Sequence, residues 1–106
     1  MEDFIFKKTT NEQGLVEILE LSGMLVLDNS EKIKNELLNV IQCLNNKIRI
    51  EIKDVQEIDI TFIQIILAFI NYLDDNHILY KFGWSLTAEL QTLLENVGFS
   101  NELFLN

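Results

Sequence analysis

The sequence predicts an α/β fold, a single small domain over residues 1–106 in which a mixed β-sheet with an N-terminal hairpin carries about three to four helices. Segments with apolar residues at every second position alternate with segments whose apolar residues recur every three or four positions. No Pro/Gly/Ser-rich linker and no internal repeat divides the 106 residues, a length typical of one domain. The hydrophobic share of 48% and the charged share of 24% are ordinary for a globular chain.

The first part of the chain predicts a β-hairpin. Residues 4–8 and 15–21 both alternate apolar and polar side chains, and a polar turn at 9–14 joins them. A brief apolar stretch at 24–27 follows Gly23.

A helix and a strand are expected next. Asp28 and Glu31 have the spacing of a capping box, which predicts that the helix begins at Asp28. One apolar stripe then recurs at helical spacing, at Ile33, Leu37, Leu38, Ile41 and Leu44. β-Branched residues at every second position predict a strand over 47–55.

The next predicted helix is unusually apolar. It begins at Asp59 or Thr61 and runs to Leu73, and its apolar residues cover nearly the whole circumference. Thr61 and Gln64 form a second possible capping box.

The last predicted elements are a strand over 78–84 and a helix from Ser85 to Gly98. Helices that lie between strands require crossover connections, so we expect the sheet to be at least partly parallel, with the hairpin at its edge.

The charge of the chain argues against two classes of partner. Lys and Arg number 8 against 17 Asp and Glu, which gives a net charge of -9 and a pI near 4.4. An acidic surface repels phosphate backbones and anionic lipid, so we expect no nucleic-acid partner. The most apolar run, 58–73, is too short and too polar for membrane insertion, and the N-terminus shows no secretory signal. We therefore expect a cytoplasmic protein.

Convergent reactive groups are missing from the sequence, so we expect no enzyme, no metal and no cofactor. His77 stands beside an Asp-Asp-Asn turn and is expected to be solvated. Cys43 stands beside an apolar stripe and is expected to be a partly buried structural thiol. No Cys/His metal-ligand spacing and no glycine-rich phosphate loop occurs.

The junction before the apolar helix carries the best candidate site. Asp59 supplies a carboxylate and Thr61 a hydroxyl at the expected helix start. Either group could cap free backbone N–H groups. A hydroxyl at this place is also a favourable position for a phosphate, which would change the local charge by about -2.

This junction resembles the central signature of STAS domains, the sulfate-transporter and anti-sigma-factor-antagonist family, in the pattern Val55-x-x-Ile58-Asp59-x-Thr61-x-Ile63-Gln64-x-Ile66. The family's early L-x-G-x-L segment is similar to Leu21-Ser22-Gly23-Met24-Leu25. Its C-terminal helix and closing turn are similar to Ser85–Phe99 and Leu103-Phe104. The similarity covers about residues 14–105.

The resemblance implies a non-enzymatic partner-switching regulator of the bacterial anti-sigma factor antagonist (anti-anti-sigma) type. Such proteins bind an anti-sigma factor or serine/threonine-type kinase, which phosphorylates a Ser or Thr at the start of the second helix and thereby dissociates the complex. The usual acceptor directly follows the Asp, where this chain has Ile60, and Phe62 replaces the usual Gly. The resemblance thus implies Thr61 as the candidate phosphoacceptor and Asp59 as the organiser of the site.

Two alternatives stay open at this point. A constitutive subunit or scaffold, of a chemotaxis-type signalling complex or a lipid-transport ATPase, would bind its partner without phosphorylation. Exposed side chains at Ile60, Phe62, Ile63 and Gln64 would then form the interface. An enzyme or small-ligand sensor of this fold, with Tyr80 and Trp84 lining a pocket, is the other alternative. In each case we expect a monomer or a weak homodimer.

Overall fold

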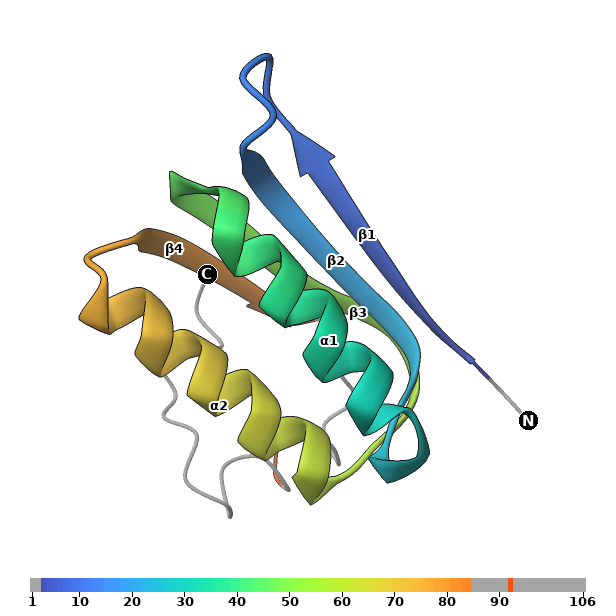
Figure 1. Ribbon diagram of the computed structural model, residues 1–106. Helices are drawn as coiled ribbons and strands as arrows, with labels where there is room; N and C mark the ends of the chain where they lie inside the picture. Colours follow the sequence, from blue (N-terminus) through green and yellow to red (C-terminus); the bar gives the residue numbers. More distant parts are fainter. Residues whose placement is uncertain (1–2, 85–91, 93–106) are drawn as a thin grey trace.

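The computed structural model describes residues 3–84 and Thr92 (Figure 1). Its sheet consists of β1 (Phe4–Thr10), β2 (Val16–Leu25), β3 (Leu44–Ile58) and β4 (Leu79–Trp84). Two α-helices connect the later strands, namely α1 (Ser30–Val40) and α2 (Ile60–Asp75). Short 3₁₀ turns flank α1, namely η1 (Leu27–Asn29) and η2 (Ile41–Cys43).

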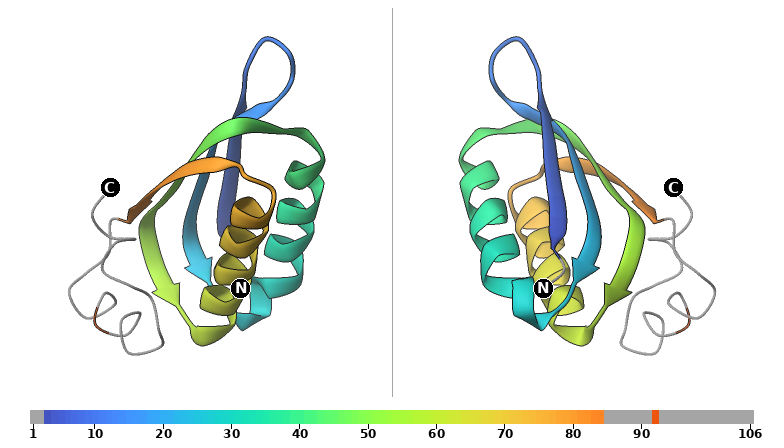
Figure 2. Two further views of the ribbon diagram at one scale, coloured as in Figure 1. Left: turned by 90° about the vertical axis from the view of Figure 1, so that its left-hand side faces the viewer. Right: turned by 90° about the vertical axis from the view of Figure 1, so that its right-hand side faces the viewer.

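The strands lie in the order β1-β2-β3-β4, so each strand pairs with its neighbour in the chain. β1 and β2 form an antiparallel hairpin, whereas β2, β3 and β4 are parallel. The mixed sheet with the hairpin at its edge is therefore confirmed. The connections from β2 to β3 and from β3 to β4 advance in the same direction across the sheet. Right-handed crossovers of this kind place both helices on one face, as Figure 2 shows.

The structure corrects the limits of the first helix, and residues 3–84 hold two α-helices, which does not support the predicted three to four. The helix predicted from Ser85 to Gly98 lies outside the described residues apart from Thr92, which is helical. α1 begins at Ser30, and its N-cap Asn29 makes no side-chain capping bond, so the capping box predicted at Asp28 does not form. The chain first makes the turn η1, which moves the helix start past Asp28. Leu44 is the first residue of β3, not part of the helical stripe.

The core lies between the sheet and the two helices. Alternate residues of β2 and β3 point toward the helices and are fully buried, among them Leu19, Leu21, Ile50 and Ile52. The buried side of α2 consists of Phe62, Ile63, Ile66, Phe69, Ile70 and Leu73. α1 contributes Ile33, Leu37 and Val40. Because α2 supplies more of this layer than α1, the fold depends mainly on the burial of one side of α2.

Gly23 occupies a position that other residues cannot easily adopt. It has φ +88°, and a Cβ at this position would lie 2.7 Å from the backbone oxygen of Asp3. The pairing of β2 with β3 is irregular on both sides of Gly23. The glycine thus lets β2 bend while the start of β1 packs directly against its backbone.

We predict that Gly23→Ala lowers the free energy of unfolding by about 1–3 kcal/mol, because it combines a left-handed backbone with a steric clash. Gly14→Ala is the matched control, since Gly14 has φ +81° but no atom within 4 Å of a Cβ. Urea denaturation of both variants measures the difference. Equal losses would show that backbone conformation alone, and not the contact with β1, requires glycine at position 23.

Tyr80 on β4 gives the fold a pH dependence at high pH. Burial raises the pKa of its hydroxyl above the ordinary 10.0, and the Asp74 carboxylate near the end of α2 raises it further. The unfolded chain therefore loses this proton at a lower pH than the folded protein does.

The contribution of the protonated Tyr80 hydroxyl to the free energy of unfolding is therefore fully present below pH 10.0. It is lost as the pH rises through the pKa of the folded protein. We predict that Tyr80→Phe reduces this decline and that Asp74→Asn reduces it in part. Urea denaturation at about pH 9 and about pH 11 measures the change. A decline in Tyr80→Phe as large as in the wild type would assign the effect to other groups.

Candidate functional site

Asp59 joins three segments of the chain at the start of α2. It is the N-cap residue of α2, with Oδ1 accepting a hydrogen bond from the backbone N–H of Phe62 at 3.2 Å. Its Oδ2 accepts a second hydrogen bond from the backbone N–H of Leu27 at 2.8 Å. The backbone N–H of Asp59 donates to the Leu25 carbonyl oxygen at 3.3 Å. One residue thus holds the start of α2 against the end of β2 and the turn η1.

The topology explains why these segments meet. β2 and β3 are parallel, and Leu25 and Ile58 are the last residues that pair between them. Both strands therefore end at the same edge of the sheet, where α1 and α2 also begin. In open α/β sheets, binding sites commonly form at this carboxyl edge. The two helix starts consequently lie side by side (Figure 1).

Thr61 lies in the first turn of α2 and is half-buried. Its hydroxyl forms no hydrogen bond with any residue that the structure describes, and Asp59 instead caps the helix. The second capping box, predicted at Thr61 and Gln64, is therefore wrong. The hydroxyl is left available because the carboxylate two residues earlier already accepts the N–H bond of this turn.

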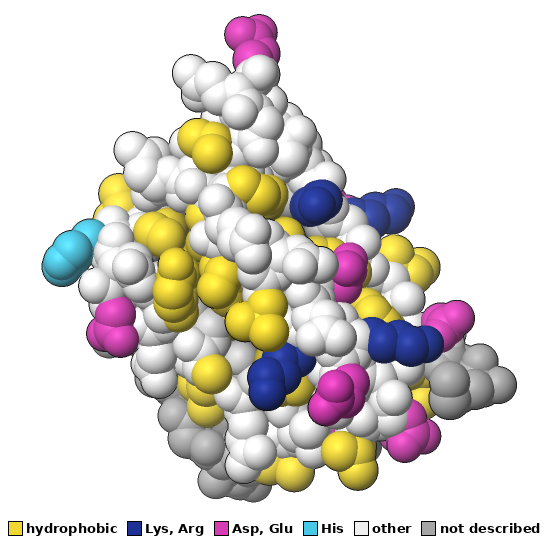
Figure 3. All heavy atoms as spheres, in the orientation of Figure 1, with side chains coloured by type: hydrophobic (Ala, Val, Ile, Leu, Met, Phe, Trp, Pro, Cys, Tyr) yellow, Lys and Arg dark blue, Asp and Glu magenta, His cyan; other side chains and the backbone are white. Residues whose placement is uncertain are grey.

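A groove of about 370 Å³ separates α1 from α2. Its lining consists of Lys34, Leu37, Leu38, Ile41, Thr61, Gln64, Ile65, Ala68, Phe69 and Tyr72. Figure 3 shows hydrophobic side chains gathered between the two helices at the surface. Thr61 and Lys34 both line the groove from the early part of their helices. Apolar grooves of this size between helices are common binding places in proteins.

Electric charge is nearly absent from this groove although the chain has a net charge of -9. No Asp, Glu, Lys or Arg occurs in α2 between Ile60 and Leu73. Lys34 is the one charged residue among the described residues that line the groove. The surface therefore costs little to desolvate when a partner covers it.

The residues predicted to form an interface divide into two pairs. Ile60 is 48% exposed, and Gln64 is exposed and lines the groove. Phe62 and Ile63 are 0% and 1% exposed, so the expectation that they are exposed is wrong. Both face the sheet because they lie on the buried side of α2. An almost wholly apolar helix gives no sequence signal for which of its sides faces the core.

The α1 wall of the groove was not predicted from the sequence. Leu38 belongs to the apolar stripe predicted for this helix, but its side chain is 48% exposed and lines the groove. The available signal was the adjacent pair Leu37-Leu38, since neighbouring residues of a helix point about 100° apart and Leu37 is the one in line with Ile33. Leu27 is a further exposed apolar residue, at the edge of the sheet where the helices begin. Its backbone N–H donates to Asp59.

Other residues singled out by the sequence lie apart from the groove. His77 is exposed in the turn after α2, as predicted, and Cys43 is half-buried against the core, also as predicted. Tyr80 does not line the groove, and the side chain of Trp84 lies outside the described part of the chain.

The described residues contain no group of three or more His, Cys, Asp and Glu side chains that could hold a metal ion. Within the same residues, neither helix combines the length and hydropathy needed to cross a membrane.

Comparison with models of known protein families finds no match for this chain, and comparison with curated proteins finds none either. The resemblance to STAS domains therefore depends on the sequence pattern described above.

We predict that Asp59→Ala lowers the free energy of unfolding by about 1–3 kcal/mol, because two backbone N–H groups lose their acceptor. Asp28→Ala removes an exposed carboxylate of the same region that caps no helix, and should change stability by less than about 0.5 kcal/mol. Urea denaturation measures both. Equal small changes would show that the two hydrogen bonds of Asp59 contribute little to stability.

Proposed function

We propose that this protein is a non-enzymatic regulator, similar to STAS domains of the anti-sigma factor antagonist type, that binds a protein partner at the start of α2. The observation that carries the proposal is the Thr61 side chain, which lines an apolar surface groove and is not used to cap the helix. Modification of the Thr61 hydroxyl would therefore change the chemistry of the groove without removing a hydrogen bond that caps α2. We expect this regulator to act in the bacterial cytoplasm.

The shape of the groove supports a helical segment of the partner as the bound element. Thr61 and Tyr72 both line the groove, and eleven residues of helix extend about 16 Å. This length matches about three turns of a helix whose apolar side is inserted between α1 and α2. Leu38 and Ile60 are the exposed apolar residues that such a segment would cover.

Phosphorylation of Thr61 would oppose this binding. A phosphate adds a charge of about -2 and requires solvation, whereas the groove is apolar. The Asp59 carboxylate two residues away would repel it, and the Phe62 N–H, a natural donor to a phosphate here, already donates to Asp59. A kinase or anti-sigma factor that modifies Thr61 would therefore be released after phosphorylation.

A constitutive scaffold or subunit is the second candidate, and Ile60 favours it. This residue takes the place of the usual family phosphoacceptor, and its apolar side chain is 48% exposed at the start of α2, next in sequence to the groove-lining Thr61. An exposed isoleucine suits a permanent apolar contact with a signalling or transporter subunit.

We predict that Thr61→Glu weakens binding of the partner at least about tenfold, whereas Thr61→Val binds like the wild type, because the added charge and not the lost hydroxyl opposes docking. The partner is first isolated with the wild-type protein from native cells and identified by mass spectrometry, which also reports phosphate on Thr61. Calorimetric titration of the purified pair then measures the affinities.

Gln56→Glu is the matched control, since it adds the same charge at an exposed position of β3 that does not line the groove. Leu38→Ser tests the groove itself and should weaken binding. Equal affinities of Thr61→Glu and Thr61→Val, with unmodified Thr61 in a stable complex, would replace the switch with the scaffold. Full binding by both Leu38→Ser and Thr61→Glu would remove the partner from this groove.

A further inference from the structure

Basic side chains gather on the face of the sheet that points away from α1 and α2. Ile48, Ile50 and Ile52 of β3 and Phe82 of β4 are buried toward the helices, so the residues between them point to the opposite face. This alternation places Lys47, Arg49 and Lys53 of β3 and Lys81 of β4 on that face. Lys7 of β1 lies there too, because it pairs with Glu20. These are five of the chain's eight Lys and Arg residues. We call this surface the basic sheet face.

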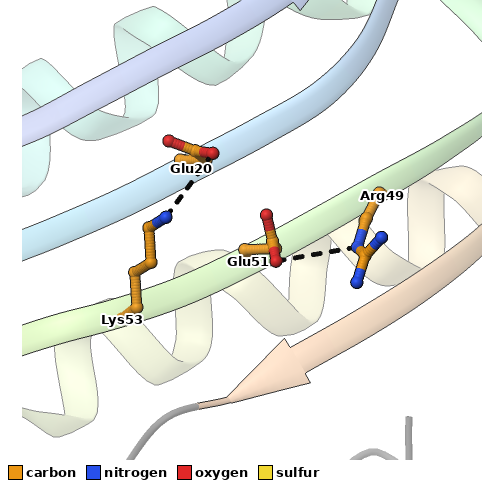
Figure 4. A network of polar contacts seen from close by, with 4 residues as sticks. All are labelled: Glu20, Arg49, Glu51 and Lys53. Carbon is orange, nitrogen blue, oxygen red and sulfur yellow. Dashed lines mark ion pairs between the residues drawn. The ribbon is translucent and has the colours of Figure 1, made fainter.

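Ion pairs balance one part of the basic sheet face. Lys53 Nζ lies 3.6 Å from Glu20 Oε1, and Arg49 Nε lies 3.6 Å from Glu51 Oε1 (Figure 4). These two pairs lie along β2 and the middle of β3. They leave the part near β4 without a comparable balance of charge.

Lys47 and Lys81 lie in this part of the basic sheet face, beside Arg49, which is ion-paired with Glu51; we call these three residues the cationic cluster. Lys47 and Lys81 form no ion pair within residues 3–84, and both are exposed. Arg49 and Lys81 are direct partners in the pairing of β3 with β4. Like charges directly opposite one another on neighbouring strands repel and destabilise a sheet. Such an arrangement in a chain of net charge -9 favours an external anion that offsets the repulsion.

The cationic cluster surrounds a surface hollow of about 220 Å³, lined by Glu17, Lys47, Ile48, Arg49 and Lys81. Glu17 is the one carboxylate of this lining and offsets part of the positive charge. With Glu51 paired to Arg49 as well, three cations face two carboxylates, which leaves the hollow with one excess positive charge among the described residues. Its volume suits a few side chains and not a folded domain.

We propose that the cationic cluster binds a short acidic segment of a partner protein in extended conformation. Lys47 and Arg49 are two residues apart on β3, a spacing of about 6.6 Å. Carboxylates two residues apart in an extended peptide have the same spacing, so two Asp or Glu side chains can meet the two cations together. This surface lies on the opposite side of the sheet from the α1–α2 groove and does not depend on the function proposed for it.

The net charge limits the length of the bound anion. With five basic residues on this face, the rest of the chain is more acidic than its net charge of -9 suggests. A nucleic acid or another long polyanion would extend over that acidic surface and be repelled. A segment with two or three carboxylates gains the attraction of the cationic cluster without that repulsion.

The test uses the full chain labelled with ¹⁵N and an acetylated, amidated peptide of alternating Glu and Val residues. We predict that the peptide shifts the amide signals of Lys47, Arg49 and Lys81, and that raising the salt from about 0.02 M to about 0.3 M weakens binding. Lys81→Gln should weaken binding about two- to fivefold, which corresponds to one exposed ion pair.

Lys32→Gln is the matched control, because Lys32 is exposed on α1 and its loss changes the net charge equally. The unliganded Lys81→Gln protein should be at least as stable as the wild type in urea, since the repulsion against Arg49 is removed. Equal weakening by the two variants would reduce the effect to net charge and overturn the site. The proposal also fails if a Gln/Val peptide shifts the same signals, or if inorganic phosphate shifts them while the Glu/Val peptide does not.

Discussion

The arrangement of the edge of the sheet where α1 and α2 begin depends on the two hydrogen bonds that the Asp59 carboxylate accepts. One comes from Phe62 inside α2 and the other from Leu27 in the turn before α1, so a single side chain fixes two helix starts relative to each other. Both helices begin at the ends of neighbouring parallel strands, so the topology alone brings their first turns near each other. The hydrogen bonds of Asp59 then fix the distance between these two turns. That separation determines the width of the groove which Thr61 and Lys34 line.

The burial of α2 decides which of its residues can contact a partner. Its apolar side chains exceed what one side of a helix can bury, so Phe62 and Ile63 enter the core while Ile60 stays 48% exposed. The remaining apolar residues reach the surface beside Leu38 of α1. A surface of this kind is disfavoured on an isolated protein and favours an interface. The same excess of apolar residues therefore stabilises the fold and leaves an apolar surface between α1 and α2.

Much of the fold follows from periodicity alone. The alternation in 47–55 and the helix after Asp59 were predictable, and so was the mixed sheet, because helices between strands require parallel crossovers. The start of α1 was not predictable, since η1 displaces the capping box that Asp28 and Glu31 suggest. The site was predictable at Asp59 and Thr61, which are close in sequence. Its α1 wall was not, because Leu38 and the α2 residues come to line one groove only through tertiary packing.

Charge is distributed unevenly between the two faces of the sheet, and this has a consequence for how partners can bind. The helical face presents a mainly apolar groove, with Lys34 as the one charged residue among its described lining, where attraction would come from apolar burial and change little with salt. The opposite face concentrates five basic residues, where attraction is electrostatic and weakens with salt. A partner that inserts a helix between α1 and α2 leaves the basic sheet face accessible, because the sheet lies between the two surfaces. The two proposals together would let one small domain hold two segments at once, and the second contact would then benefit from the high effective concentration that the first creates.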